Sequence, residues 1–203
     1  MKILVATTNP GKVAELKAML EADVEWLSLS DFDNVTEIKE DGDTFAENAR
    51  KKAAGYAKAT GLWTIADDSG LVVDALGGAP GVKSARFSGA TDKDKKLSDK
   101  KNTAKVLELL KDTPNEKRTA RFICHLCLAS PEKILVETEG ALEGVIAQEA
   151  MGENGFGYDP IFFLPYLNKT VAQLSAAEKN AISHRGNAIG RLKPLLRGLL
   201  EKG

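Results

Sequence analysis

The stretch KILVATTNPGKVAEL at the start of the chain is the feature that most constrains the fold. The apolar run over residues 3–6 is typical of a buried strand, and it stops at Thr7, Thr8 and Asn9. A proline and a lysine follow, and apolar residues then recur with a helical period. A strand that feeds a helix in this way is where α/β proteins hold phosphate groups. Its single glycine matches neither common glycine-rich phosphate loop, so the turn is a candidate phosphate site of another kind.

Helical and strand patterns alternate along the rest of the chain. A helix is expected between Thr44, which forms a capping box with Glu47, and Gly61. A short strand over residues 62–66 should stop at the sequence DDSG, and residues 71–73 should form another strand. Residues 118–129 and 134–147 predict a β-hairpin with a turn that begins at Ser130. This order predicts an α/β fold with a mixed central sheet flanked by helices.

Two further regions are expected to be helical. Residues 91–112 predict either a helical hairpin or one long irregular helix, with its charges on a solvated face. Residues 175–200 have a helical period, with Ser175 and Glu178 as a second capping box, and Pro194 should kink or break the last helix. Because no repeat or linker divides the chain, we expect a single domain over residues 1–203.

Composition limits the kinds of partner. The 203-residue chain has a net charge of -1, which argues against a dedicated nucleic-acid binder, because such a protein depends on excess Lys and Arg. No segment has the continuous apolar length of a membrane span, and the N-terminal strand shows no signal peptide. We therefore expect a cytoplasmic protein with a small-molecule substrate.

Two cysteines form the motif C-x-x-C at Cys124 and Cys127. A zinc site would need further ligands, and the only histidines are His125 and His184. The surrounding residues alternate as a strand, so side chains three residues apart point to opposite faces. Two small buried thiols are the favoured interpretation over a redox pair.

Polar residues gather at two element ends in the first half of the chain. Lys12 lies in the first turn of a helix, where a positive charge opposes the helix dipole, so it is poorly placed for stability and well placed for a polyphosphate. Asp67 and Asp68 end a buried strand, and two adjacent carboxylates repel each other unless a cation or proton intervenes. The acidic stretch KEDGD could add a ligand for Mg²⁺. The alternatives are an exposed lysine and two aspartates that only bound a turn.

Two more polar clusters lie toward the C-terminus. In GFGYDP, Phe156 and Tyr158 carry rings that can stack on a base, although such a loop can equally pack on the core. In EKNAISHR, Lys179, His184 and Arg185 bring three hydrogen-bond donors within two helical turns, or they form a solvated face. The four clusters together supply what a nucleoside triphosphate needs: phosphate donors, a metal site, a stacking ring and donors that distinguish bases.

The motifs TTNPGK, EDGDTFAENA, ADDSGLVVDALGGAPGVKSARFSG, GFGYDPIFF and AEKNAISHR resemble, in this order, those of the inosine triphosphate pyrophosphatase family. The resemblance runs from residue 3 to the C-terminal helix. It implies two lobes around a deep nucleotide cleft, usually a homodimer, and Mg²⁺-dependent hydrolysis of ITP, dITP and XTP to the monophosphate and pyrophosphate. Such enzymes remove deaminated purine nucleotides from the nucleotide pool.

The resemblance also implies a role for particular residues. Asp68 would accept a proton and bind the metal, and Glu40 would be the second metal ligand, although many family members have a second glutamate where this chain has Lys39. The residues implied in substrate binding are Thr7, Thr8, Asn9, Pro10, Gly11 and Lys12 for the triphosphate, Ser69, and Phe156, Gly157, Tyr158, Asp159, Lys179, His184 and Arg185, mostly for the base.

Two other interpretations remain open from the sequence. A Maf-like pyrophosphatase of other modified nucleotides shares the same chemistry but should lack the SHR and FGYDP motifs. A nucleotide sensor without turnover would have no need of a carboxylate that activates water, whereas this chain has Asp67, Asp68 and Glu40.

Overall fold

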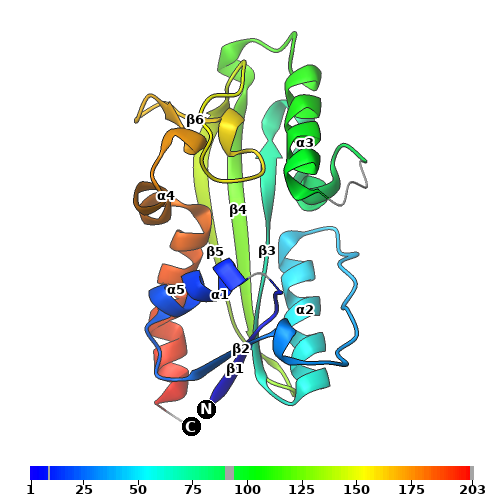
Figure 1. Cartoon of the computed structure of the whole chain (residues 1–203), viewed down its shortest axis with the longest axis vertical. Coiled ribbons are helices and arrows are strands. Elements are labelled where there is room, and N and C mark those ends of the chain that lie inside the picture. The colour runs from blue at the N-terminus through cyan, green and yellow to red at the C-terminus, as the bar shows by residue number, and fades with distance from the viewer. Residues whose placement is uncertain (9, 90–93, 202–203) are drawn as a thin grey trace. The chain divides into compact units, whose positions relative to one another are not determined.

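A computed structural model describes residues 1–8, 10–89 and 94–201 of the chain (Figure 1). The chain divides into two compact units, and each is described by itself. Unit 1 consists of residues 1–68, 124–140 and 184–203, and unit 2 consists of residues 69–123 and 141–183.

The strands of the described residues form one seven-stranded sheet in the order β2-β1-β3-β4-β5-β6-β7. Strand β1 pairs in parallel with β2 and β3, whereas β6 pairs antiparallel with β5 and β7. The mixed sheet and the α/β class are therefore confirmed. The strands are β1 (Lys2–Val5), β2 (Glu25–Ser28), β3 (Trp63–Val73), β4 (Thr119–Ala129), β5 (Ile134–Ile146), β6 (Phe162–Leu164) and β7 (Lys169–Thr170).

Unit 1 covers both faces of its strands with helices. Helices α1 (Pro10–Leu20) and α5 (His184–Leu200) pack on one face and α2 (Phe45–Thr60) on the other, as Figure 1 shows. Alternation along β3 assigns side chains to these faces, because neighbouring residues of a strand point in opposite directions. Ile65 packs with α1 and α5, and Ala66 packs with α2.

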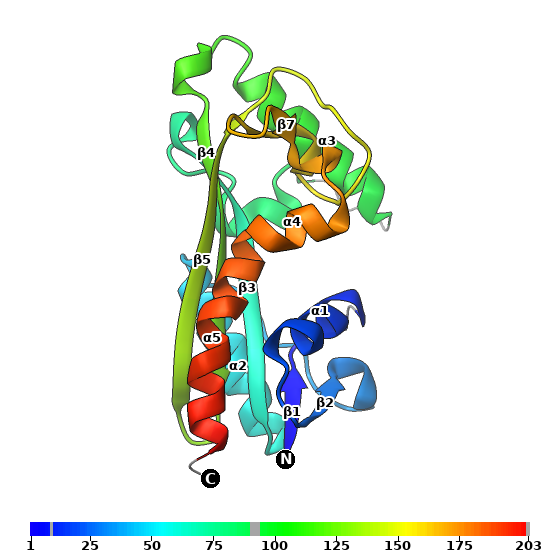
Figure 2. The same cartoon turned by 90° about the vertical axis from the view of Figure 1, so that its left-hand side faces the viewer.

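Unit 2 has a core of its own around α3 (Lys95–Leu109) and the segment that follows β5. Residues from β3, α3, β4, β5 and β6 form this core, which includes Leu71, Val106 and the fully buried Phe162. Helix α4 (Ala176–Ile182) also belongs to unit 2. Figure 2 shows α3 next to the loop that precedes β6. Ser175 caps α4, and the capping box with Glu178 is present as predicted.

Three sequence-based expectations about elements need correction. The sequence DDSG does not end a strand, because β3 continues through it from Trp63 to Val73. The last helical region is broken at Ser183, which has extended backbone angles, and α5 continues through Pro194 to Leu200. Helix α2 is capped by Thr44 and Gly61 as predicted, but Glu47 Oε2 accepts from Asp43 N rather than from Thr44 N.

Other expectations are confirmed within the described residues. Residues 95–109 form one helix rather than a hairpin. Strands β4 and β5 are neighbours, and Ser130 N donates to Lys133 O at 2.9 Å in the turn between them. Cys124 and Cys127 are buried, are not in a disulfide and lie in separate core clusters on opposite faces, and burial raises the pKa of Cys127 to about 12. Neither thiol is therefore placed for redox chemistry.

None of the helices in residues 1–8, 10–89 and 94–201 has the length and apolar character that a bilayer span requires.

Candidate functional site

Asp67 is the centre of a buried charge cluster in unit 1. Its carboxylate accepts from Lys12 Nζ at 2.9 and 3.1 Å and from an Arg185 terminal nitrogen at 3.1 Å. Lys12 comes from the first turn of α1 and Arg185 from the first turn of α5, the two helices on the face to which Asp67 points. Strand alternation thus determines which cations Asp67 meets.

The charge of Asp67 is maintained by these cations. Burial by itself raises the pKa of a carboxyl group, but Lys12, Arg185 and Lys52 together hold the pKa of Asp67 far below its usual value. Asp67 therefore stays ionised at any pH near neutrality. The sequence-based argument that Lys12 is poorly placed for stability needs correction, because the Asp67 carboxylate compensates its charge in this structure.

Asp68 points to the opposite face of β3, toward α2. Its Oδ2 accepts a hydrogen bond from Asn48 Nδ2 at 2.9 Å, and Asn48 Oδ1 accepts from Gly42 N at 2.8 Å. Asn48 is thereby oriented from both ends of its amide. The two adjacent aspartates therefore need no shared cation to relieve their repulsion, because the strand separates them and each has its own partners.

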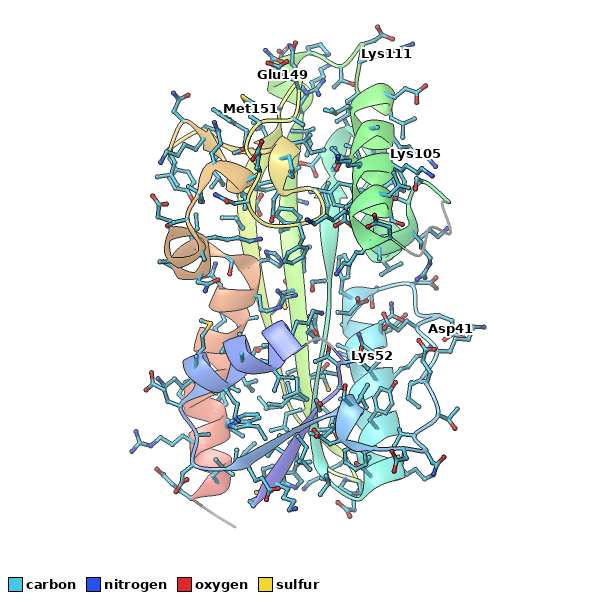
Figure 3. All side chains as sticks on the ribbon, viewed as in Figure 1. Asp41, Lys52, Lys105, Lys111, Glu149 and Met151 are labelled. Carbon is cyan, nitrogen blue, oxygen red and sulfur yellow. The ribbon has the colours of Figure 1, made fainter. Side chains whose placement is uncertain are left out.

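Lys52 links the acidic segment before α2 to β3. Its Nζ donates to the Asp67 carbonyl oxygen at 2.5 Å and lies 3.1 Å from Glu40 Oε1. Lys52 is nearly buried, whereas Glu40 is partly exposed. Asp41, from the same acidic segment, pairs instead with Lys51 Nζ at 2.8 Å; Figure 3 labels Lys52 and Asp41. Among the acidic residues of this segment, Glu40 is therefore the one that is tied to β3.

In unit 2, the residues 155–159 form a loop around the Asp159 carboxylate. Asp159 Oδ2 accepts from Phe156 N at 2.9 Å and from Lys179 Nζ at 2.5 Å. Burial raises the pKa of Asp159, although Lys179 opposes that shift. Gly155 has a φ of +76°, and a Cβ there would lie 2.0 Å from Asp159 Oδ2, so only glycine allows this loop to close on its aspartate.

The two aromatic rings of this loop have different environments. Phe156 is 55% exposed, and Lys179 Nζ lies 4.5 Å from its ring centroid. Tyr158 is buried in the core of unit 2 and its hydroxyl donates to Ser84 O at 2.7 Å. Of the two aromatic residues, Phe156 is therefore the exposed one, and Tyr158 is part of the core.

The remaining predicted residues are found as follows. Thr7 follows β1, and its N–H donates to Val5 O while its carbonyl accepts from Leu29 N. Thr8 is exposed, Asn9 lies outside the described residues, and Pro10 and Gly11 open α1. Ser69 is part of β3 and belongs to unit 2, and His184 is the first residue of α5 in unit 1. The structure thus gathers Lys12, Asp67, Asp68, Glu40 and Arg185 in unit 1 and Phe156, Asp159 and Lys179 in unit 2.

Sequence reasoning missed four polar residues that hold these groups. Asn48 and Lys52 are four residues apart on α2, so a helical period places both on one face, and this signal could have found them. Asp99 and Thr103 have the same spacing on α3 and contact Gly157. Their sequence surroundings, a run rich in lysine, gave no sign of this role.

In unit 1 two cations meet the buried carboxylate of Asp67, and in unit 2 the carboxylate of Asp159 binds the backbone N–H of the exposed Phe156. With the mixed sheet and its flanking helices, these features define an α/β protein that has a buried, charge-paired aspartate in each unit. The model of the Ham1 family matches residues 3–195. The chain belongs to the Ham1 family.

Individual relatives match over almost the full length. A dITP/XTP pyrophosphatase of Exiguobacterium sibiricum is 52% identical over 199 residues, which cover 97% of each chain. The solved structure of a HAM1 protein from Coxiella burnetii has a TM-score of 0.89 and 40% identity, and the match covers 98% of this chain and 99% of that one. The structure of a nucleoside-triphosphatase, dITP/XTP pyrophosphatase, from Mycobacterium abscessus has a TM-score of 0.81 and 48% identity, with 96% and 100% covered.

Proposed function

We propose that this chain hydrolyses deaminated purine nucleoside triphosphates (ITP, dITP and XTP) to the monophosphate and pyrophosphate, and so removes them from the nucleotide pool. The observation that carries the proposal is the 52% identity, over 97% of both chains, to a relative named dITP/XTP pyrophosphatase. Membership of the Ham1 family together with intact SHR and FGYDP motifs argues against a Maf-like enzyme.

The proposed reaction is the attack of water on the α-phosphorus. The bond between this phosphorus and the oxygen that bridges to the β-phosphorus breaks, and pyrophosphate leaves with that oxygen. Asp68 accepts the proton of the attacking water, a contribution of roughly 10²–10⁴-fold. The hydrogen bond from Asn48 Nδ2 to Asp68 Oδ2 at 2.9 Å orients the carboxylate for this step.

Fixed positive charge is the second requirement of the reaction. Lys12, from the first turn of α1, is the proposed triphosphate contact, together with the backbone and side chains of residues 7–11. Lys12 reaches Asp67 at 2.9 Å in this structure, so a triphosphate would share the cation with a carboxylate that stays ionised. Because Lys12 is already held in place, little free energy is needed to reorient it when negative charge develops on the phosphates.

Mg²⁺ is the proposed cofactor, and the residues present fit it as an ion that arrives with the nucleotide. Within the described residues, no group of three or more His, Cys, Asp or Glu side chains is arranged to hold a metal. Mg²⁺ typically combines one or two carboxylates with water and substrate phosphates, and Asp68 and Glu40 are the proposed carboxylates. When bound, the ion would neutralise charge on the leaving pyrophosphate.

Selection of the base is assigned to hydrogen-bond donors and the exposed ring. Hypoxanthine and xanthine present a 6-keto acceptor, whereas adenine presents a 6-amino donor. Donors from Lys179, His184 or Arg185 would pair with the keto group and oppose the amino group, and a mismatch of this kind can reject an analogue by roughly 10⁴–10⁵. Phe156, a residue that is 55% exposed, is the proposed stacking platform.

Pyrophosphate release from ITP, XTP, GTP, ATP and dTTP, each with Mg²⁺, tests the proposal. We expect ITP and XTP to be hydrolysed far faster than ATP, because adenine presents a 6-amino donor. Fastest release from dTTP would favour a pyrimidine-directed enzyme, and tight binding of ITP without any release would favour a sensor. Omission of Mg²⁺ from the ITP reaction tests the cofactor separately, and undiminished turnover without it would remove Mg²⁺ from the proposal.

A further inference from the structure

One face of α3 lies against the loop of residues 155–159 in unit 2. Lys95, Asp99 and Thr103 are spaced four residues apart, so a helix places them in one row. Lys95 Nζ lies 5.4 Å from the centroid of the Phe156 ring, and the other two residues contact Gly157. None of the three was among the residues assigned to the substrate above.

Asp99 and Thr103 hold both polar groups of Gly157. Asp99 Oδ2 accepts from Gly157 N at 2.9 Å, and Thr103 Oγ1 donates to Gly157 O at 3.3 Å. Gly157 has a φ of +62°, a conformation that L side chains rarely adopt. Glycine adopts this conformation without strain, and the two contacts with α3 fix the position of its backbone groups.

The orientation of Phe156 depends on the groups before and after it. Its own N–H donates to Asp159 Oδ2 at 2.9 Å, and the N–H of the next residue, Gly157, donates to Asp99. Two successive backbone N–H groups are thus bound by two carboxylates, one from the loop itself and one from α3. Asp99 also lies close enough to Asp159 to add to the rise in its pKa that burial causes.

Helix α3 also holds the segment that binds Tyr158. Asn102 is buried; its Oδ1 accepts from Ser88 N at 2.7 Å, and its Nδ2 donates to Ala85 O at 3.2 Å. Lys105, labelled in Figure 3, donates to Phe87 O at 2.8 Å. Through these contacts α3 fixes residues 81–88, whose Ser84 O accepts the Tyr158 hydroxyl. The helix therefore supports the loop both directly and through its neighbour.

We propose that Asp99 is a positioning residue for base binding: through Gly157 it holds Phe156 where the purine ring stacks. The inference rests on the proposed function, because it assumes that Phe156 meets the base. Within residues 94–201, Asp99 is hydrogen-bonded to the loop backbone, at Gly157 N. Its loss should therefore weaken the binding of a substrate that carries a base and leave the chemistry at the phosphates nearly unchanged.

The test compares Asp99→Ala with two other variants of α3. Asp99→Asn keeps an oxygen that can accept from Gly157 N, and Glu108→Ala removes an exposed carboxylate from the same helix. For Asp99→Ala we expect KM for ITP to rise about tenfold, the effect of one lost hydrogen bond to a charged acceptor, with kcat changed less than about twofold. Asp99→Asn should recover most of the loss, and Glu108→Ala should match the wild type.

Inorganic tripolyphosphate, used as a competitive inhibitor, separates positioning from general damage to the fold. It carries the phosphates without a base, so its inhibition constant should be the same for wild type and Asp99→Ala. The proposal is overturned by an unchanged KM for ITP in Asp99→Ala, or by an equal rise in KM and in the tripolyphosphate inhibition constant. Absence of ITP turnover in the wild type would instead show that the proposed function has failed, and Asp99 would lose its assigned role with it.

Discussion

At the scale of single residues, Asp67 sets the charge balance of unit 1. One buried carboxylate meets the side chains of Lys12 and Arg185, and its backbone oxygen meets Lys52. Arg185 is itself buried, so its charge depends on Asp67 for compensation. A buried ion pair contributes little by its presence, but removal of one partner is costly because it leaves a charge without compensation.

Asp67→Asn should therefore lower the free energy of unfolding by about 3 kcal/mol, the usual cost of breaking a buried pair. Pyrophosphate should raise the melting temperature of the variant more than that of the wild type, because an anion can replace the lost carboxylate between the two cations. Thermal unfolding with and without pyrophosphate measures both effects. As a control, Glu25→Gln, which breaks the exposed pair with Lys2, should leave the melting temperature nearly unchanged.

The same variant tests the low pKa of Asp67. A carboxyl group whose pKa is lowered in the folded state contributes stability that is present above its unfolded pKa of about 3.9 and is lost as the pH falls through the folded pKa. The difference in melting temperature between wild type and Asp67→Asn should therefore be constant from about pH 7 to 5 and narrow only below about pH 4. A difference that already closes between pH 7 and 5 would show that the carboxyl group protonates in that range.

Asp68 is the proposed acceptor of the proton from the attacking water. Asp68→Asn should lower kcat for ITP by at least about 10²-fold, because an amide does not act as a base. The fold should survive, since an asparagine oxygen can still accept from Asn48 Nδ2. Steady-state kinetics and a thermal melt of the variant check the two statements, and turnover near the wild-type rate would exclude Asp68 from the mechanism.

At the scale of elements, the sequence predicted many of the helices and strands, but not the partners of their polar side chains. Strand alternation and helix caps are local signals, so β1, α2 and the β4–β5 hairpin were predictable. The continuation of β3 through DDSG was not, because the partners that stabilise its aspartates come from α1, α2 and α5, which are distant in sequence. The break at Ser183 was missed because a local signal was misleading. Proline is a stronger helix breaker than serine, so a break was expected at Pro194, yet Pro194 lies inside α5.

Gly140 and Gly190 have different surroundings. A side chain at Gly140 would collide with a neighbouring element, whereas a side chain at Gly190 would change only the helix propensity. A Cβ at Gly140 of β5 would lie 2.1 Å from His184 O and 2.4 Å from Ala188 N, so the strand and the start of α5 can approach only without a side chain. A Cβ at Gly190 within α5 would meet nothing within 4 Å.

Gly140→Ala should therefore destabilise the protein by about 2 kcal/mol and lower the melting temperature by roughly 4–8 °C. It should also lower activity on ITP, because the displaced start of α5 carries His184 and Arg185. Gly190→Ala should raise stability by roughly 0.5–1 kcal/mol through helix propensity alone. Thermal unfolding of both variants measures these changes. A change of melting temperature in the same direction for both variants would contradict the steric role of Gly140.

At the scale of the whole molecule, the α/β class followed from the order of helices and strands, and the sheet topology confirms it. The family followed from five ordered motifs, and the match to the Ham1 family over residues 3–195 confirms it. The homodimer, the single domain with two lobes and the cytoplasmic location remain predictions. Sedimentation of the purified protein across a range of concentrations tests the dimer. Oligomeric state, lobe arrangement and location depend on the protein surface and on other molecules. The sequence motifs, in contrast, contain the side chains proposed to act in the reaction, so they do not predict these properties directly.

Hydrolysis of ITP in water enriched in ¹⁸O, followed by ³¹P NMR of the products, tests the central claim most directly. The account predicts inosine monophosphate and pyrophosphate as the only products, with the new ¹⁸O atom on the monophosphate, because water attacks the α-phosphorus. Label in the pyrophosphate would place the attack on the β-phosphorus, and a diphosphate with free phosphate would place the cleavage at the other anhydride. Either result would contradict the account.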